Sequence, residues 1–458
     1  MAEVRIDTRL SQTTVPATQG PRMLYLLIQV SEISQEDRTL MPVNLAVLVD
    51  VSESMRIPLL SEAQFHELAR RGAVREVVAD GIPVWQFQNV PQGFGDGLPC
   101  ALSLVQQALR QVIEGLTARD TLSLVAFASK VKPLVSSRSV EDKAALLKAI
   151  DGLTKVKLGD DTYLAQGLAT TIAEASRGVS PRCISRVLVL TDGFTRDEAA
   201  CWRAIEDARQ QGIGVSTMGL GSEFNQELMI DLAEQSGGTA RLILDPSQVA
   251  DALIEEQVAA MNIVCRDLQL RLRFSQGIEV RGMYRVRPDL ADLGLAGYAE
   301  RSLGVSLGDL GNRERRSILL ELVIPPRPPG MYRLAHLDLS YTSLISSAPP
   351  RVSQDVVVEY SAEGAQGDTD TTVMSVVERV SALKLQLRAA QDLQAGDTAG
   401  ATRRLHAAAT RLLNMGEAEL ADAVRAEADH VEQHSQMSAM GTRRLRYETR
   451  RLTQRLDA

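Results

Sequence analysis

Five oxygen-bearing side chains in three separated segments of this sequence could together bind one cation. Asp50, Ser52 and Ser54 form a D-x-S-x-S motif in "VLVDVSESM". Thr162 lies in "LGDDTYLAQGL" and Asp192 lies in "VLVLTDG". Two carboxylates and three hydroxyls make an all-oxygen set, which suits a hard divalent cation. The sequence therefore predicts a site for Mg²⁺, with Mn²⁺ and Ca²⁺ as alternative ions.

The neutral hydroxyls in this set have a consequence for what else the cation binds. Because only the two aspartates carry charge, the cation keeps enough net charge to attract a further carboxylate. We expect that carboxylate to come from an acidic residue of a partner protein. The predicted function is therefore a non-enzymatic, cation-dependent protein–protein interaction.

The elements that must position these residues form a doubly wound, mostly parallel α/β sheet of Rossmann-like type over residues 43–262. Short apolar strands alternate there with amphipathic helices, which is typical of this architecture. We expect six strands, in "VNLAVLVDV", "TLSLVAFAS", "KPLVSS", "SRVLVLTDG", "GVSTMGLG" and "TARLILD". Ligands of open α/β sheets bind beyond the carboxyl ends of the strands. The three segments should therefore converge on that edge of the sheet.

Segments on both sides of the α/β region show a different pattern, in which polar and apolar residues alternate. "CRDLQLRLRF" and "SQDVVVEYSAE" have this pattern after residue 262, and "MLYLLIQVSEI" has it before residue 43. Such alternation, with Pro and Gly turns, predicts an antiparallel β-sandwich. We therefore expect the α/β domain to be inserted into a sandwich made of residues 1–42 and 263–362.

The remaining residues predict a linker and a C-terminal α-helical region. Residues 363–371 are polar, and residues 372–458 contain amphipathic segments broken by glycines. The chain ends in a basic segment with five arginines: Arg443, Arg444, Arg446, Arg450 and Arg451. These arginines could bind an acidic partner or nucleic acid. Pairing with the acidic helix around residues 417–432, or a solvated tail, is the preferred interpretation.

Two weaker patterns in the helical region could also carry chemistry. Thr442, Thr449 and Thr453 lie among the arginines and are candidate kinase substrates. His430 and His434 have the i, i+4 spacing of metal ligands on a helix. Because no third ligand accompanies them, a solvated helix face is the preferred interpretation of the histidines.

With these features, residues 43–262 resemble a von Willebrand factor type A (VWA) domain. That family's metal-ion-dependent adhesion site is matched residue by residue by Asp50, Ser52, Ser54, Thr162 and Asp192. The resemblance implies that the serines and the threonine coordinate the metal directly or through water, and that the aspartates act through water or orient the other ligands. Glu53 departs from the family, in which glycine is common, and its charge puts the metal affinity in question. The whole chain resembles bacterial VWA proteins and inter-alpha-trypsin-inhibitor-like proteins in architecture.

An insertion over residues 56–97 separates the serine motif from the first helix, whereas other family members reach that helix within a few residues. "SEAQFHELARRG" predicts a short helix, and "VREVVADGIPVWQF" predicts a hairpin. Because both ends of the insertion join the metal face, we expect it to stand near the metal. The candidate partner contacts are Glu53, Phe65, Trp85, Phe87 and Phe94. For the aromatic residues, packing within the insertion itself is the preferred interpretation.

Composition and motifs argue against several other functions. The net charge of −8 disfavours nucleic-acid binding, and no apolar run is long enough to cross a membrane. The start has no secretory apolar segment, so we expect a cytoplasmic protein, of bacterial type. No P-loop, dinucleotide fingerprint, G-x-S-x-G or H-E-x-x-H motif is present. The sequence therefore indicates no enzyme class.

Two alternative functions stay open. The same cation could act as a Lewis acid in a hydrolase, with Asp160, Asp161 or Glu53 as the only candidate bases. The chain could also be a structural scaffold whose metal site is idle. The neighbouring genes would indicate the pathway: an AAA+ ATPase would suggest a remodelling machine, and a kinase or FHA-domain protein would suggest signalling.

Overall fold

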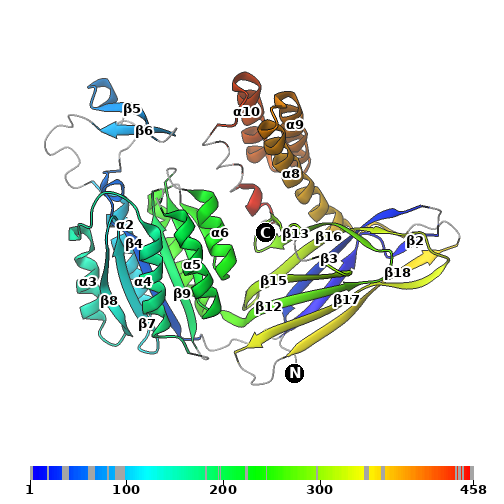
Figure 1. Ribbon diagram of the computed structural model, residues 1–458, viewed down its shortest axis with the longest axis horizontal. Helices are drawn as coiled ribbons and strands as arrows, with labels where there is room; N and C mark the ends of the chain where they lie inside the picture. Colours follow the sequence, from blue (N-terminus) through cyan, green and yellow to red (C-terminus); the bar gives the residue numbers. More distant parts are fainter. Residues whose placement is uncertain are drawn as a thin grey trace. The chain divides into compact units, whose positions relative to one another are not determined.

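The computed structural model contains two compact units, whose elements are labelled in Figure 1. One unit combines Met1–Arg38 with Val264–Ala458, and the other is Thr39–Ile263. The second unit therefore interrupts the chain of the first. The structure describes residues 4–17, 20–33, 41–59, 68–79, 82–87, 98–180, 183–193, 195, 197–221, 225–243, 245–295, 298–344, 350–362, 367–438, 441, 445 and 448–453.

The α/β unit is built on a six-stranded sheet with the order β11-β10-β9-β4-β7-β8. Its strands are β4 (Val43–Asp50), β7 (Thr121–Phe127), β8 (Val131–Ser139), β9 (Ile184–Thr191), β10 (Gly214–Leu220) and β11 (Ala240–Ile243). All neighbours are parallel except β7 and β8. Every residue of β4, β9 and β10 is buried, because helices cover both faces of the sheet. This burial explains the almost continuous apolar runs in the sequence.

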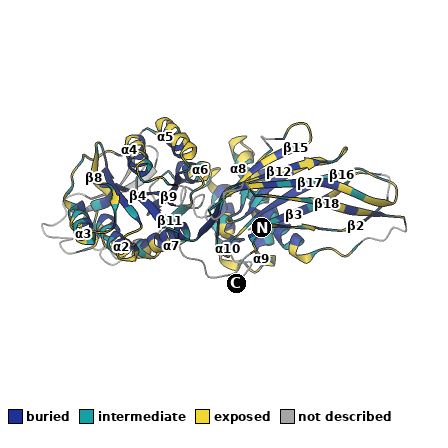
Figure 2. Cartoon of the chain, turned by 90° about the horizontal axis from the view of Figure 1, so that it is seen from below, coloured by how far each residue is buried: buried dark blue, intermediate teal, exposed yellow. Residues whose placement is uncertain are grey.

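Helices lie on both faces of this sheet. They are α2 (Ala101–Gly115), α3 (Lys143–Asp151), α4 (Leu164–Ser176), α5 (Glu198–Gln210), α6 (Gln226–Ser236) and α7 (Val249–Met261). Figure 2 shows α4, α5 and α6 on one face, and α2, α3 and α7 on the other. Between the sheet and α4, α5 and α6 lies an aliphatic core that includes Leu48, Leu168 and Ile205.

A buried asparagine fixes the start of β4, at the end of the strand opposite Asp50. Asn44 donates from Nδ2 to the carbonyl oxygen of Ala175 (2.7 Å) and to Oγ of Ser185 (3.0 Å). Its Oδ1 accepts from Oγ1 of Thr121 (2.7 Å). A shift of register would leave this buried amide unpaired, which is costly. The bonds therefore hold β4 between β7 and β9 and determine where Asp50 emerges.

The β-sandwich of the other unit consists of two five-stranded sheets. The first has the order β1-β3-β16-β13-β14 and contains β1 (Val4–Leu10), β3 (Arg22–Glu32), β13 (Glu279–Arg287), β14 (Ala291–Asp292) and β16 (Arg315–Ile324). The second has the order β15-β12-β17-β18-β2 and contains β2 (Thr14–Pro16), β12 (Ile263–Phe274), β15 (Ser302–Gly311), β17 (Gly330–Ser343) and β18 (Arg351–Ser361). N-terminal β3 pairs antiparallel with β16, so strands from both sides of the α/β unit share a sheet. The predicted fold class, an α/β sheet inserted into a β-sandwich and followed by helices, is confirmed.

Helix α8 (Thr371–Gln394) covers the outer face of the first sandwich sheet. Leu27 and Leu319 of the sheet pack there in one apolar cluster with Val376 of the helix. In the same region, Nζ of Lys384 lies 2.7 Å from Oε1 of the buried Glu321. The helical region and the sandwich therefore form one compact unit.

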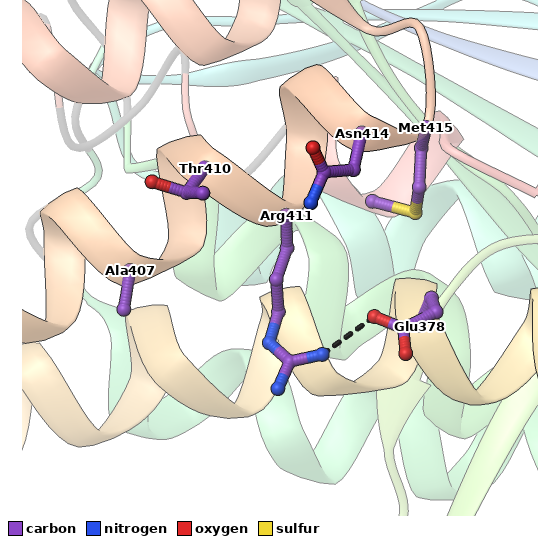
Figure 3. A pocket seen from close by; sticks show the side chains of 6 residues that line it. All are labelled: Glu378, Ala407, Thr410, Arg411, Asn414 and Met415. Atoms are coloured by element: carbon purple, nitrogen blue, oxygen red, sulfur yellow. Dashed lines mark hydrogen bonds and ion pairs between the residues drawn. The ribbon is translucent and has the colours of Figure 1, made fainter.

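Helices α9 (Thr398–Asn414) and α10 (Ala418–His434) follow α8. A pocket of about 530 Å³ lies between α8 and α9, lined by Glu378, Ala407, Thr410, Arg411, Asn414 and Met415 (Figure 3). Arg411 points toward Glu378, and the distance from Nη1 to Oε2 is 2.5 Å. The arginine of this pocket is therefore neutralised within the helical region. Among the helices that the structure describes, none is both long and apolar enough to cross a membrane.

The basic C-terminal segment contacts the sandwich at Arg450. Its Nη2 lies 2.5 Å from Oδ2 of Asp289, and its carbonyl oxygen accepts from the N–H of Leu290 (2.8 Å). The predicted pairing with the acidic helix is therefore wrong for Arg450. Asp289 is mostly buried and pairs with two arginines, since Nη2 of Arg285 lies 2.7 Å from its Oδ1. Arg443, Arg444 and Arg446 lie outside the described residues.

Two of the three candidate phosphorylation sites are buried. Thr449 donates from Oγ1 to Oε1 of Gln386 (2.9 Å), and Thr453 donates to the carbonyl oxygen of Val286. Neither residue is accessible to solvent. Because a kinase cannot reach a buried hydroxyl in the folded chain, the prediction is wrong for both threonines. Thr442 lies outside the described residues.

The two histidines of α10 contact each other. Their rings stack with centroids 4.2 Å apart, and Nδ1 of His434 lies 3.1 Å from the carbonyl oxygen of His430. Within the part of the chain that the structure describes, no group of three or more His, Cys, Asp or Glu side chains is placed to hold a metal ion. A cation site in these residues would therefore need other oxygen ligands as well, such as hydroxyl groups or carbonyl oxygens.

Candidate metal centre

Asp50 is the last residue of β4, and its side chain is fully buried. Its Oδ1 accepts from the backbone N–H of Ser52 (2.9 Å), which closes an Asx-type turn at the strand end. Its Oδ2 accepts from Oγ1 of Thr191 (2.6 Å), which is the last residue of the neighbouring strand β9. Because both carboxylate oxygens are held, the orientation of the group is fixed.

A run of hydrogen bonds connects the serine motif to Asp192. Oγ of Ser52 lies 3.1 Å from Oγ of Ser54, which in turn donates to Oδ1 of Asp192 (2.8 Å). Ser54 begins a short 3-10 helix, η1 (Ser54–Arg56), and Asp192 directly follows β9. The two strand ends therefore bring together residues that lie 138 positions apart in the sequence.

Thr162 joins these residues from the third segment, two positions before α4 begins. It is buried, and the N–H of the next residue, Tyr163, donates to the carbonyl oxygen of Ala128 beyond the end of β7 (3.2 Å). A Cβ atom built on Gly193 would lie 3.3 Å from Oγ1 of Thr162. The threonine hydroxyl thus lies against the backbone that follows Asp192. All five predicted residues are gathered at one edge of the sheet; that they bind a metal stays a prediction.

Among the residues that the structure describes, no basic side chain bonds to the buried carboxylate of Asp50. Burial raises the pKa of its carboxyl group above the ordinary value, and hydrogen bonds from Ser52 and Thr191 only partly oppose this rise. Those bonds come from a backbone N–H and hydroxyl groups, which are neutral. Isolated buried charges are costly, so the folded chain gains if a cation is supplied.

Arg56 lies close to Asp50 in the sequence, yet its guanidinium is bonded to other groups. It donates to the carbonyl oxygens of Val51 (3.3 Å), Thr154 (2.6 Å) and Val156. Two of these carbonyls belong to the segment around η2 (Leu153–Lys155), which precedes Thr162. Arg56 is therefore not a cationic partner of Asp50. The donor set fits a divalent ion, since the five side chains gathered at this edge of the sheet offer oxygen ligands and two of them are carboxylates.

Two residues that support the site were not predicted from the sequence. Thr191 precedes Asp192 and Arg56 follows Ser54 by two positions, but their partners Asp50 and Thr154 lie far away in the chain. A polar residue at the end of an otherwise apolar strand was the one available signal for Thr191. The arginine carried no signal, because its carbonyl partners have no sequence signature.

The carboxylates predicted beside the site are exposed. Glu53 precedes η1 with φ −64° and ψ −36°, a helical conformation that any residue adopts. Glycine is therefore not required at this position, and the side chain of Glu53 extends into solvent. Asp160 and Asp161 are likewise exposed, and the N–H of Asp161 donates to Oγ of Ser129 (3.0 Å).

The insertion contains the predicted hairpin. Strands β5 (Val74–Ala79) and β6 (Ile82–Phe87) pair antiparallel, and Trp85 lies opposite Glu76 in the register. Phe87 ends β6 opposite Val74. Phe65 and Phe94 lie outside the described residues. The proposed partner contacts of the insertion therefore stay a prediction.

Two family models match the chain. A model described as von Willebrand factor type A domain matches residues 100–255, and one described as Sll0103-like, C-terminal alpha-helical domain matches residues 371–455. The first range includes Thr162 and Asp192 and begins after the 56–97 insertion, so the D-x-S-x-S motif precedes it. The predicted resemblance of the α/β unit is confirmed.

Relatives differ in how much of the chain they share. The Synechocystis protein described as uncharacterized protein sll0103 is 28% identical over 331 residues, which are 69% of this chain and 75% of that protein. Matrilin-1 of Mus musculus is 35% identical over 130 residues, which are 27% of this chain and 26% of matrilin-1. The probable E3 ubiquitin-protein ligase WAVH2 of Arabidopsis thaliana is 24% identical over 257 residues, 54% of this chain and 34% of the ligase. The chain thus spans only about a third or less of the last two proteins.

Two solved structures share the fold across nearly the whole chain. A von Willebrand factor type A protein from Catenulispora acidiphila has a TM-score of 0.69 at 17% identity, covering 97% of this chain and 96% of its own. The ArnB paralog VWA2 from Sulfolobus acidocaldarius has a TM-score of 0.53 at 16% identity, covering 98% of both chains. At these identities the similarity concerns the fold alone.

Proposed function

We propose that this chain, which contains a von Willebrand factor type A domain and a Sll0103-like C-terminal helical domain, binds a partner protein through a divalent cation. VWA domains generally mediate protein–protein interactions. The cation, Mg²⁺ in the first instance, would be completed by an acidic side chain of the partner. The residues of the candidate metal centre support this more specific function.

Each of the five residues has a distinct role in the proposal. The hydroxyl oxygens of Ser52, Ser54 and Thr162 would hold the cation, and the two aspartates would either bind it or orient the hydroxyls. When bound, the cation supplies the positive charge that attracts a carboxylate of the partner. The chain's own groups fix the donors: Thr191 and the Ser52 N–H orient Asp50, and Asp192 orients Ser54.

One observation carries the proposal. Oγ of Ser52, Oγ of Ser54 and the carboxylate of Asp192 form a run of hydrogen bonds beside the buried carboxylate of Asp50, which bonds to no basic side chain within the described part of the chain. A protein interior ordinarily pairs a buried carboxylate with a basic side chain or a metal. Because Arg56 is bonded to three carbonyls, the arrangement favours a metal.

A test with Mn²⁺ as the probe separates cation binding from carboxylate binding. The full chain is loaded with Mn²⁺, and water proton relaxation is measured while a short Asp-containing peptide, or its Asn counterpart, is added at millimolar concentration. We expect the Asp peptide alone to lower the relaxation enhancement, because its carboxylate replaces a water on the ion. We also expect Asp192→Ala to lose the Mn²⁺ binding itself. Equal responses to the two peptides would refute the proposal.

A further inference from the structure

Helix α4 begins two residues after Thr162 and is capped from outside its own segment. Tyr163, at its N-cap position, provides no side-chain hydrogen bond. Instead, the N–H of Leu164 donates to Oγ1 of Thr195 (2.9 Å), and the N–H of Ala165 donates to Oδ2 of Asp197 (3.1 Å). The first two N–H groups of a helix need such partners, because they have none within the helix.

Asp197 is positioned to cap a different helix. It is the N-cap residue of α5, where an aspartate usually accepts from an N–H of its own first turn. Its side chain makes no such bond to α5. Both carboxylate oxygens bond to groups outside α5. Oδ1 accepts from Oγ1 of Thr195 (2.6 Å), and Oδ2 accepts from the N–H of Ala165 in α4. Thr195 and Asp197 therefore cap α4, and the side chain of Asp197 does not cap α5.

The two capping residues come from the loop that begins with Asp192. Thr195 follows Asp192 by three positions, and its Oγ1 also lies 3.3 Å from the carbonyl oxygen of Thr162. Within the same loop, the N–H of Gly193 donates to Oγ1 of Thr191, which holds Asp50. One loop thus contacts the other two segments that provide candidate ligands.

We propose that Thr195 and Asp197 are positioning residues of the cation site. By capping α4 they fix Thr162 to the loop that carries Asp192, so that three ligand segments keep one geometry before the cation binds. The inference rests on the proposed function, because it concerns the same cation. Neither residue is a ligand in this proposal. They restrict the conformations of the ligand segments before binding, so that the cation does not have to order those segments itself.

The experiment compares matched variants of the full chain. Thr195→Val keeps the size of the side chain and removes the hydroxyl, whereas Thr195→Ser keeps the hydroxyl. Asp197→Ala is the second disruptive variant, in case Thr195→Val fails to fold. Thr170→Val is the control, because the bond that the Thr170 hydroxyl makes among the described residues is to the carbonyl oxygen of Gln166 of the same helix, on the exposed side of α4. Mn²⁺ affinity is measured by EPR, and hydrogen exchange of the peptide around residues 160–170 is measured in EDTA.

We expect Thr195→Val and Asp197→Ala to weaken Mn²⁺ binding by about fivefold to tenfold, as for loss of a helix cap. Thr195→Ser should restore the affinity, and Thr170→Val should leave it unchanged. Exchange at the start of α4 should be faster in the two disruptive variants. A residue that only stabilised the fold would change the melting temperature in EDTA without changing the affinity of the folded protein.

Two other results would overturn the inference in distinguishable ways. If the wild type binds Mn²⁺ and Thr195→Val and Asp197→Ala bind it equally well, Thr195 and Asp197 do not position the site, and the proposed function stands. If the wild type binds no Mn²⁺, or if Asp192→Ala binds it as well as the wild type, the proposed function fails and the inference fails with it.

Discussion

Folding buries the carboxylate of Asp50, and in the described ranges of the chain its hydrogen bonds come from neutral groups alone. Because burial raises its pKa above the ordinary 3.8, the folded chain holds the proton more tightly than the unfolded chain. Its protonation therefore stabilises the fold at low pH, and this contribution is lost as the pH rises through the raised pKa. At neutral pH, the metal-free protein should be destabilised by this charge.

Removing the charge at Asp50 should stabilise the metal-free protein. In EDTA at neutral pH, we expect Asp50→Asn to melt about 2 to 4 °C above the wild type, which corresponds to roughly 1 kcal/mol in a domain of this size. The difference should shrink as the pH falls toward 3.8, because the raised pKa of the wild-type carboxyl favours its neutral form. Added Mg²⁺ should raise the melting temperature of the wild type alone. A variant that is less stable than the wild type in EDTA would contradict this account of Asp50.

At the scale of the elements, the strands could be predicted from the sequence. The side-chain contacts that join distant segments could not. The apolar runs predict β4 and β9 because both strands are buried on both faces. The carboxyl-end rule then predicts that the segments after the two strands meet, as Ser54 and Asp192 do. Arg56 and Thr195 were missed because their partners lie in other segments. No local spacing encodes such contacts. The role of the insertion could not be decided from the sequence either, since its aromatic residues fit a core, the preferred interpretation, and also a binding surface.

Arg56 provides an element-scale test, since it joins η1 to the segment around η2, 98 residues away. We expect Arg56→Met to lower the free energy of unfolding of the α/β unit by about 2 kcal/mol, because three carbonyls lose a charged donor. Arg56→Lys should not restore the stability, since one ammonium group cannot replace a planar fork. Urea unfolding in EDTA measures both variants.

Arg110→Met serves as the matched control for Arg56, because Arg110 forms an exposed ion pair with Asp151 in the same unit. Its loss should change the free energy of unfolding by less than about 0.5 kcal/mol. Wild-type stability in Arg56→Lys would show that the three carbonyl bonds are not what joins the two segments.

At the scale of the whole molecule, the chain contains separate cores in its two units. One core lies between the sandwich sheets, and another lies between the α/β sheet and α4, α5 and α6. The sandwich unit also contains the Lys384–Glu321 pair, in which the Glu321 side chain is 10% exposed and the Lys384 side chain 26%. Perturbing one core should therefore leave the other largely unchanged.

Calorimetry of the full chain should show a separate unfolding transition for each of these two units. We expect Mg²⁺ to raise the transition of the α/β unit alone. Glu321→Ala should lower the free energy of unfolding of the sandwich unit by about 2 kcal/mol. The loss is smaller than for a fully buried pair because Lys384 stays partly exposed to solvent. Glu279→Ala, which breaks an exposed pair with Arg281, should have little effect. A single transition that Mg²⁺ and Glu321→Ala both shift would show that the units unfold together.

The most direct measurement of the central claim is an anomalous difference map from crystals of the full chain soaked in Mn²⁺. We predict a peak among the oxygen atoms of Asp50, Ser52, Ser54, Thr162 and Asp192, and no such peak in crystals of Asp192→Ala. A map of the wild type without a peak at this position, or with its strongest peak elsewhere on the chain, would contradict the claim that these five residues bind a cation.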